Sequence, residues 1–146
     1  MQLCLRLFNM ISGIGSVAVL VNDARRSAEW YRDKLGFEIV VMEGHSVFVK
    51  PQGSSFPLVH LCGKCHDWGN DKPGGRTGIW LNCGKIIFHK RKDSEQMIPA
   101  SDPANVEETF QELRRKGAEF STDITTTDWG KMAILRDPDG NELELS

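Results

Sequence analysis

A helix that ends at a glycine and passes directly into a strand occurs twice in this chain. Leu35-Gly36-Phe37-Glu38 and Lys116-Gly117-Ala118-Glu119 hold equivalent places, each after a helix pattern and before alternating strand patterns. An apolar strand pattern also precedes each helix. Because self-similarity at long range indicates one supersecondary unit used twice, we predict two β-α-β-β-β units in tandem.

The first unit spans residues 14–62. Ile14 to Val21 reads as a buried strand, and Asp23 is the N-cap of a helix that ends at Gly36. Glycine suits the left-handed conformation that ends a helix. Three strands of an antiparallel meander are expected next, over residues 37–42, 46–50 and 57–62.

A glycine-rich linker over residues 63–76 separates this unit from the second, which spans residues 77–146. The second unit begins with a strand at 77–83, followed by an irregular or hairpin-like insertion from Gly84 to Ala100. A helix then opens at Asp102-Pro103 or Asn105. We expect its last strands at 118–120, 131–136 and 141–145, and we take residues 1–13 as an extension ahead of a single domain at 14–146.

The stretch Asp137-Pro138-Asp139-Gly140 specifies a turn, because proline presets φ, aspartate caps the first position and glycine closes the fourth. A strand follows at once. Period-two alternation puts Glu142 and Glu144 on one face and Leu143 and Leu145 on the other. Two carboxylates that share a face favour a cation, water or a hydrogen-bonding ligand.

The 146-residue chain has a net charge of −2 and a sequence pI of about 6.1. This balance gives no field that would steer nucleic acid, and no apolar run approaches the length of a membrane span. The apolar start is interrupted by Arg6 and Asn9 and lacks a cleavage pattern for a secretory leader. We therefore expect a cytoplasmic protein with no nucleic-acid or membrane partner.

Cys62-Gly-Lys-Cys65-His66 matches the spacing of a c-type haem attachment, of a zinc-binding pair and of a redox pair. Haem attachment requires export, zinc lacks a second close pair, and no helix start lies next to the pair to lower a thiol pKa. We expect reduced, structural cysteines, with metal or redox use as the alternatives.

Several motifs in this order resemble the vicinal oxygen chelate superfamily, which contains glyoxalase I, bleomycin-resistance proteins and extradiol dioxygenases. They are Val19-Leu-Val-Asn-Asp23, Trp30-Tyr31-Arg-Asp-Lys-Leu35-Gly36-Phe37, Leu113-Arg-Arg-Lys-Gly117-Ala-Glu-Phe120, Trp129-Gly130 and Asp137-Pro-Asp-Gly-Asn-Glu-Leu-Glu-Leu145. The resemblance implies an α+β fold. Its two tandem βαβββ modules would form a curved, cup-shaped, eight-stranded mixed sheet with helices outside, and the protein would be a homodimer.

In the metal-dependent members, the first and last strands of each module supply the ligands. Those positions hold Ser16, His60, Gly78 and Glu144 here, so the resemblance leaves only His60 and Glu144 as metal ligands. A divalent ion that polarises a substrate needs about three protein ligands. We expect no cofactor, with an incomplete site for a divalent metal (Zn, Ni, Mn or Fe) as the alternative. His60 is also the best proton-transfer candidate because its pKa is near neutral, and Glu144 could serve as a base.

Aromatic and polar side chains on the inward faces favour a ligand cup instead. The expected lining consists of Ser16, Phe48, Trp80, Asn82, Trp129, Met132 and Glu142. Tryptophan faces can stack on a planar molecule, and a glutamate can meet a cationic or donor group. For Phe48 and Met132 a place in the core is an equal interpretation.

Three functional hypotheses follow. The first is a binding protein of the bleomycin-resistance type, which sequesters an apolar or planar small molecule. The second is a divalent-metal-dependent lyase, isomerase or dioxygenase that uses His60 and Glu144. The third is a protein partner that binds the insertion at 84–100.

Overall fold

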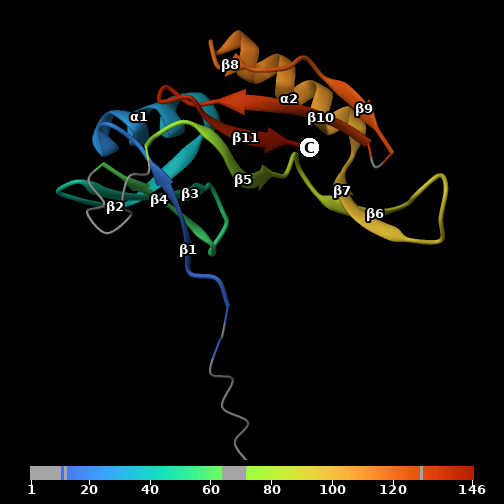
Figure 1. Cartoon of the computed structure of the whole chain (residues 1–146), viewed down its shortest axis with the longest axis horizontal. Helices are drawn as coiled ribbons and strands as arrows, with labels where there is room; N and C mark the ends of the chain where they lie inside the picture. The colour runs from blue at the N-terminus through green and yellow to red at the C-terminus, as the bar shows by residue number, and fades with distance from the viewer. Residues whose placement is uncertain (1–10, 12, 64–71, 129) are drawn as a thin grey trace, which may run out of the picture.

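The computed structural model describes residues 11, 13–63, 72–128 and 130–146 (Figure 1). Two residues of the sequence analysis, Trp129 and Cys65, lie outside the described residues. The expected N-terminal extension also lies outside them, apart from residues 11 and 13. The described part contains two helices and eleven strands. This is a mixed α+β fold, as the sequence predicts.

The first half of the chain forms one sheet covered by one helix. Its elements are β1 (Ser16–Leu20), α1 (Ala24–Leu35), β2 (Phe37–Glu43), β3 (Ser46–Pro51) and β4 (Leu58–Cys62). The strand order is β1-β4-β3-β2, with β1 parallel to β4 and the other pairs antiparallel.

The second half repeats this pairing around its own first and last strands. Its elements are β5 (Gly75–Leu81), β6 (Ile86–Lys90), β7 (Met97–Ser101), α2 (Pro103–Arg115), β8 (Glu119–Phe120), β9 (Thr125–Thr127), β10 (Gly130–Arg136) and β11 (Asn141–Leu145). The order is β5-β11-β10-β8, with β5 parallel to β11 and with β9 paired to β10.

The insertion between β5 and α2 is a separate antiparallel hairpin of β6 and β7. Figure 1 shows it projecting away from the four-stranded sheet, at the opposite end of the molecule. The described strands thus form sheets of four, five and two strands. The expected single eight-stranded cup is not confirmed.

Local signals set the ends of both helices. Asp23 Oδ1 accepts hydrogen bonds from Arg25 N (3.0 Å) and Arg26 N (3.1 Å), and Gly36 ends α1 with φ of 71°. Asp102 Oδ1 accepts from Ala104 N at 2.9 Å, so the helix begins at the aspartate before Pro103.

Two clusters of buried side chains form the core, and the first, built mainly by the first half, also includes Leu143 of β11. α1 packs on β2, β3 and β4, and α2 packs on β10. Trp30 and Leu35 of α1 contact both clusters. The clusters are therefore joined through α1.

A buried polar network also connects α1 to the turn between β10 and β11. Tyr31 Oη donates to Asp137 Oδ2 at 3.1 Å, and Asn141 Nδ2 donates to the same oxygen at 2.8 Å. The main-chain N–H groups of Asp139 and Asn141 both donate to Oδ1 at 2.9 Å. Burial nevertheless raises the pKa of the Asp137 carboxyl above its usual value, and it raises the pKa of Tyr31 as well.

The expectation of reduced cysteines fails at one position. Cys62 is disulfide-bonded, whereas Cys83 is a buried free thiol whose pKa is raised by burial. Neither described helix has the length and apolar character needed to cross a membrane.

Candidate functional site

A cleft of about 350 Å³ opens where the second sheet meets the hairpin. β5 contributes Trp80, β11 contributes Glu144, and β7 contributes Ile98 and Pro99. The other residues that line it are Arg91, Gln96 and Ser146. The cleft therefore combines an apolar wall with a small number of polar groups, which is the usual character of a small-molecule site.

Hydrogen bonds at the base of the hairpin hold Trp80 in place. Its indole Nε1 donates to the main-chain oxygen of Ser146 at 2.9 Å. Ser101 Oγ donates to the same oxygen at 2.6 Å and accepts from Cys83 N at 2.8 Å. Because the ring is fixed at its nitrogen edge and remains 39% exposed, a flat apolar surface is presented to the cleft.

The two carboxylates on β11 differ in their surroundings. Glu142 Oε1 lies 3.6 Å from Arg136 Nη2 and accepts from Ser121 Oγ at 2.9 Å. Glu144 accepts a longer bond, 3.3 Å, from Ser146 Oγ, and no ion pair to it is found within the described part of the chain. Glu144 is thus the carboxylate whose negative charge is available to a ligand.

An irregularity in β5 lies between these carboxylates. Glu142 is paired with Arg76 and Glu144 with Trp80, so β5 has more residues than β11 over the same stretch. Gly78 lies in this bulge with φ of 74°, and a Cβ there would meet nothing within 4 Å. Glycine is required by the backbone conformation, and open space remains beside it.

Arg91 brings the positive charge of the cleft. Its Nε lies 3.3 Å from Asp93 Oδ1, and its Nη2 lies 3.8 Å from Asp128 Oδ2. The Nε atom is buried, and its N–H makes no hydrogen bond of acceptable geometry to any residue that the structure describes. A ligand acceptor is therefore one way to satisfy it.

His60 and Phe48 lie on the other sheet. Their rings are stacked, with centroids 4.3 Å apart and planes 6° from parallel, and His60 Nε2 is 3.0 Å from Ser46 Oγ. Burial lowers the pKa of His60 below its ordinary value. The neutral ring is therefore favoured at neutral pH.

The remaining sequence candidates are dispersed. Ser16 is exposed on β1, Asn82 is exposed just after β5, and Met132 is half-buried on β10. Trp129 lies outside the described residues. Of the predicted site residues, the cleft contains Trp80 and Glu144, and the stacked pair contains Phe48 and His60.

The donor set does not fit a metal centre. Within the described ranges, no group of three or more His, Cys, Asp or Glu side chains could hold an ion. We derive no chemical step through a metal.

The sequence reasoning missed the contribution of the hairpin to the site. Arg91, Gln96, Ile98 and Pro99 all come from the insertion at 84–100. The apolar residues 86–88 and 97–98 favour two short strands, but nothing local indicates that they line the same cleft as Trp80.

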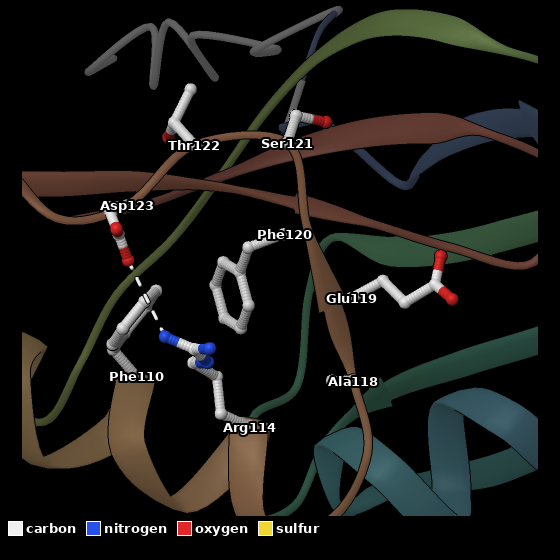
Figure 2. A pocket seen from close by; sticks show the side chains of 8 residues that line it. All are labelled: Phe110, Arg114, Ala118, Glu119, Phe120, Ser121, Thr122 and Asp123. Atoms are coloured by element: carbon white, nitrogen blue, oxygen red, sulfur yellow. Dashed lines mark ion pairs between the residues drawn. The ribbon is translucent and has the colours of Figure 1, made fainter.

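A second hollow of about 450 Å³ lies between α2 and the segment after it (Figure 2). Its polar groups have partners elsewhere: Arg114 pairs with Asp123 at 3.5 Å, Ser121 donates to Glu142, and Thr122 Oγ1 accepts from Ile134 N. Figure 2 shows Ser121 and Thr122 pointing away from the aromatic pair Phe110 and Phe120. This hollow lacks convergent polar groups, so the cleft at Trp80 is the better candidate.

Comparison with known proteins identifies one superfamily. Residues 13–145 match the model of the Glyoxalase/Bleomycin resistance protein/Dioxygenase superfamily. The uncharacterized protein YetH of Bacillus subtilis (strain 168) is 28% identical over 141 residues, which cover 93% of this chain and 98% of YetH.

Two solved structures have similar folds along nearly their whole length. A superfamily member from Sphaerobacter thermophilus DSM 20745 is 27% identical with a TM-score of 0.70, covering 93% of this chain and 97% of that one. TnmS3, an antibiotic binding protein from Streptomyces sp. CB03234, is 25% identical with a TM-score of 0.65, covering 93% and 95%.

Proposed function

The chain belongs to the Glyoxalase/Bleomycin resistance protein/Dioxygenase superfamily, and we propose that within this family it binds a small molecule without converting it. The ligand is planar and largely apolar, and it occupies the cleft between Trp80 and the hairpin. The observation that carries this proposal is the convergence of Trp80 and Glu144 in one cleft. Its volume, about 350 Å³, falls within the usual range for small-molecule sites, about 300–1,000 Å³.

The side chains of the cleft define the ligand chemistry. An aromatic ring stacks on the exposed face of Trp80 and contacts Ile98 and Pro99. A cationic or hydrogen-bond-donating substituent reaches Glu144, because this acid has no ion pair within the described residues, whereas Arg136 neutralises Glu142. The ligand is thus a planar molecule with a basic or donor group at one end.

The relatives support binding as the activity. TnmS3, which has a similar fold along nearly its whole length, is described as an antibiotic binding protein. By contrast, a metal-dependent lyase, isomerase or dioxygenase needs about three protein ligands for its ion, and no group of three or more His, Cys, Asp or Glu side chains that could hold one is found among the described residues. The cytoplasmic location and the homodimer expected from the sequence stay predictions.

Calorimetric titration with matched probes tests this proposal. The probes are a set of aminoacridines and the corresponding neutral acridines, which share a planar ring and differ in charge. Trp80→Ala should abolish measurable binding of both sets. Glu144→Gln should weaken binding of the cationic set by about tenfold, equivalent to about 1.4 kcal/mol, and leave the neutral set unchanged.

Glu142→Gln is the matched control, since it removes an identical charge from the same strand and face. We expect it to leave both affinities within about twofold, a difference of about 0.4 kcal/mol. Equal effects of Glu142→Gln and Glu144→Gln would contradict the assignment of the ligand acid. Turnover of a bound probe, detected by mass spectrometry with or without added Zn²⁺ or Mn²⁺, would contradict binding without chemistry.

A further inference from the structure

A smaller cavity of about 100 Å³ lies beside the ligand cleft and shares Glu144 with it. Arg76 and Gly78 of β5 also line this cavity, which we call the side pocket. Its volume equals that of about three water molecules at roughly 30 Å³ each. The side pocket is therefore too small for a ring system, but it has room for a small substituent of a molecule in the cleft.

The bulge in β5 forms the side pocket from the backbone itself. Thr77 Oγ1 donates to the main-chain oxygen of Glu142 at 2.8 Å and accepts from Ile79 N at 3.1 Å. These two bonds hold the bulge in the conformation in which Gly78 has φ of 74°. Because a Cβ at Gly78 would meet no atom within 4 Å, the glycine leaves this space open.

Arg76 brings a positive charge that no acidic residue neutralises. It is exposed, and it makes no ion pair or side-chain hydrogen bond to any residue that the structure describes. Its neighbour in the strand register is Glu142, which is paired with Arg136 instead. The guanidinium group of Arg76 is therefore available to an anionic group in the side pocket.

Glu144 brings the opposite charge to the same cavity. Its carboxylate accepts only a long bond, 3.3 Å, from Ser146 Oγ, and it has no ion pair within the described residues. An ammonium group beside Glu144 would leave Arg76 unpaired, whereas a carboxylate alone would be repelled by Glu144. A group that carries both charges satisfies both side chains, and guanidinium groups bind carboxylates in two-bonded geometry.

We propose that the ligand is an aromatic molecule with an α-amino-acid head, and that this head occupies the side pocket. The ammonium group lies on Glu144 and the carboxylate on Arg76. In an α-amino acid both groups are attached to one carbon, so the head is small enough for the cavity. The inference rests on the proposed function, because the aromatic ring of this ligand stacks on Trp80 in the cleft.

Calorimetric titration with three indoles tests the amino-acid head. Tryptophan carries both charges, tryptamine lacks the carboxylate, and 3-methylindole lacks both groups. We expect the wild-type chain to bind tryptophan about tenfold more tightly than tryptamine, because the carboxylate gains charge-assisted hydrogen bonds from Arg76. Tryptamine should in turn bind about tenfold more tightly than 3-methylindole, because of Glu144.

Two variants assign the two charges. Arg76→Gln should weaken binding of tryptophan by about tenfold and leave tryptamine within about twofold. Glu144→Gln should weaken both amines and leave 3-methylindole unchanged. Arg26→Gln is the matched control: Arg26 is another exposed arginine without an ion pair among the described residues, and it lies on α1 outside both cavities. It should change no affinity.

The outcomes separate this inference from the proposed function. If the aminoacridines bind but tryptophan binds no better than tryptamine, the amino-acid head is refuted and the proposed function stands. Equal losses of tryptophan affinity in Arg76→Gln and Arg26→Gln would refute it too. If neither the indoles nor the aminoacridines bind, both proposals fail.

Circular dichroism spectra of all three variants should equal that of the wild-type chain. If Arg76→Gln loses its fold, the comparison of tryptophan with tryptamine on the wild-type chain decides, since it requires no substitution.

Discussion

Removal of the Tyr31 hydroxyl tests whether the buried network at Asp137 stabilises the fold. Tyr31 is fully buried, its ring packs on Trp30 and Phe37, and its hydroxyl donates to Asp137 Oδ2 at 3.1 Å. In Tyr31→Phe the ring contacts remain and this one hydrogen bond is lost. The variant therefore isolates a polar contribution from a packing contribution.

The expected loss in the free energy of unfolding depends on the other groups that donate hydrogen bonds to the Asp137 carboxylate. A hydrogen bond to a charged group contributes about 1.5–3 kcal/mol. Since Asn141 Nδ2 still donates to the same oxygen at 2.8 Å, we expect the lower end, about 1.5 kcal/mol. For a chain of this size that lowers the unfolding midpoint by about 3–6 °C.

The effect of Tyr31→Phe should depend on pH. Burial raises the pKa of Asp137, so the folded state keeps its proton to a higher pH than the unfolded state. Taken alone, Asp137 therefore makes folding less favourable as pH rises from its pKa in the unfolded state to its pKa in the folded state. The Tyr31 donor favours the carboxylate, so its removal costs most at neutral pH and less in acid, where Asp137 becomes protonated in the folded state.

Ser27→Ala is the matched control on the same helix. Ser27 is buried, and its Oγ has no hydrogen-bond partner among the residues that the structure describes. Removal of this hydroxyl should leave stability unchanged or raise it, by about 0.5 kcal/mol from helix propensity alone. Urea unfolding followed by far-UV circular dichroism measures both variants. A Tyr31→Phe chain as stable as the wild type at neutral pH, or a loss equal at neutral and acid pH, would refute the reasoning.

Three further predictions concern the cap of α1, the bulge at Gly78 and the half-buried His60. Asp23→Ala removes the acceptor for two N–H groups of α1 and should cost about 1 kcal/mol in urea unfolding; a loss under about 0.3 kcal/mol would contradict the cap. Gly78→Ala should destabilise by about 1 kcal/mol, because alanine is strained at φ of 74° although its Cβ meets no atom; an unchanged midpoint would show that the bulge relaxes. The pKa of His60, measured by NMR, should lie below its ordinary value of about 6.5. The contribution of His60 to the free energy of unfolding is therefore fully present above that pH, and it is lost as pH falls toward the pKa of the folded state. A His60→Gln chain with the same acid dependence would contradict this.

The turns and helix ends were predictable because their determinants lie within a few residues. Asp23 and Gly36 bound α1, and Asp102 caps α2, as the sequence indicates. The turn at Asp137–Gly140 leads into β11 with its two glutamates on one face and Leu143 and Leu145 buried on the other. Side chain to backbone bonds of this kind need no distant partner.

The distinction between the two glutamates came only from the tertiary structure. Glu142 and Glu144 are equivalent in the sequence pattern, and it is Arg136 on the adjacent strand that neutralises one of them. Likewise, Trp80 lines a cleft because the β6–β7 hairpin folds beside β5. The physical reason is that a site joins residues distant in sequence, and their proximity depends on how whole elements pack rather than on any local preference.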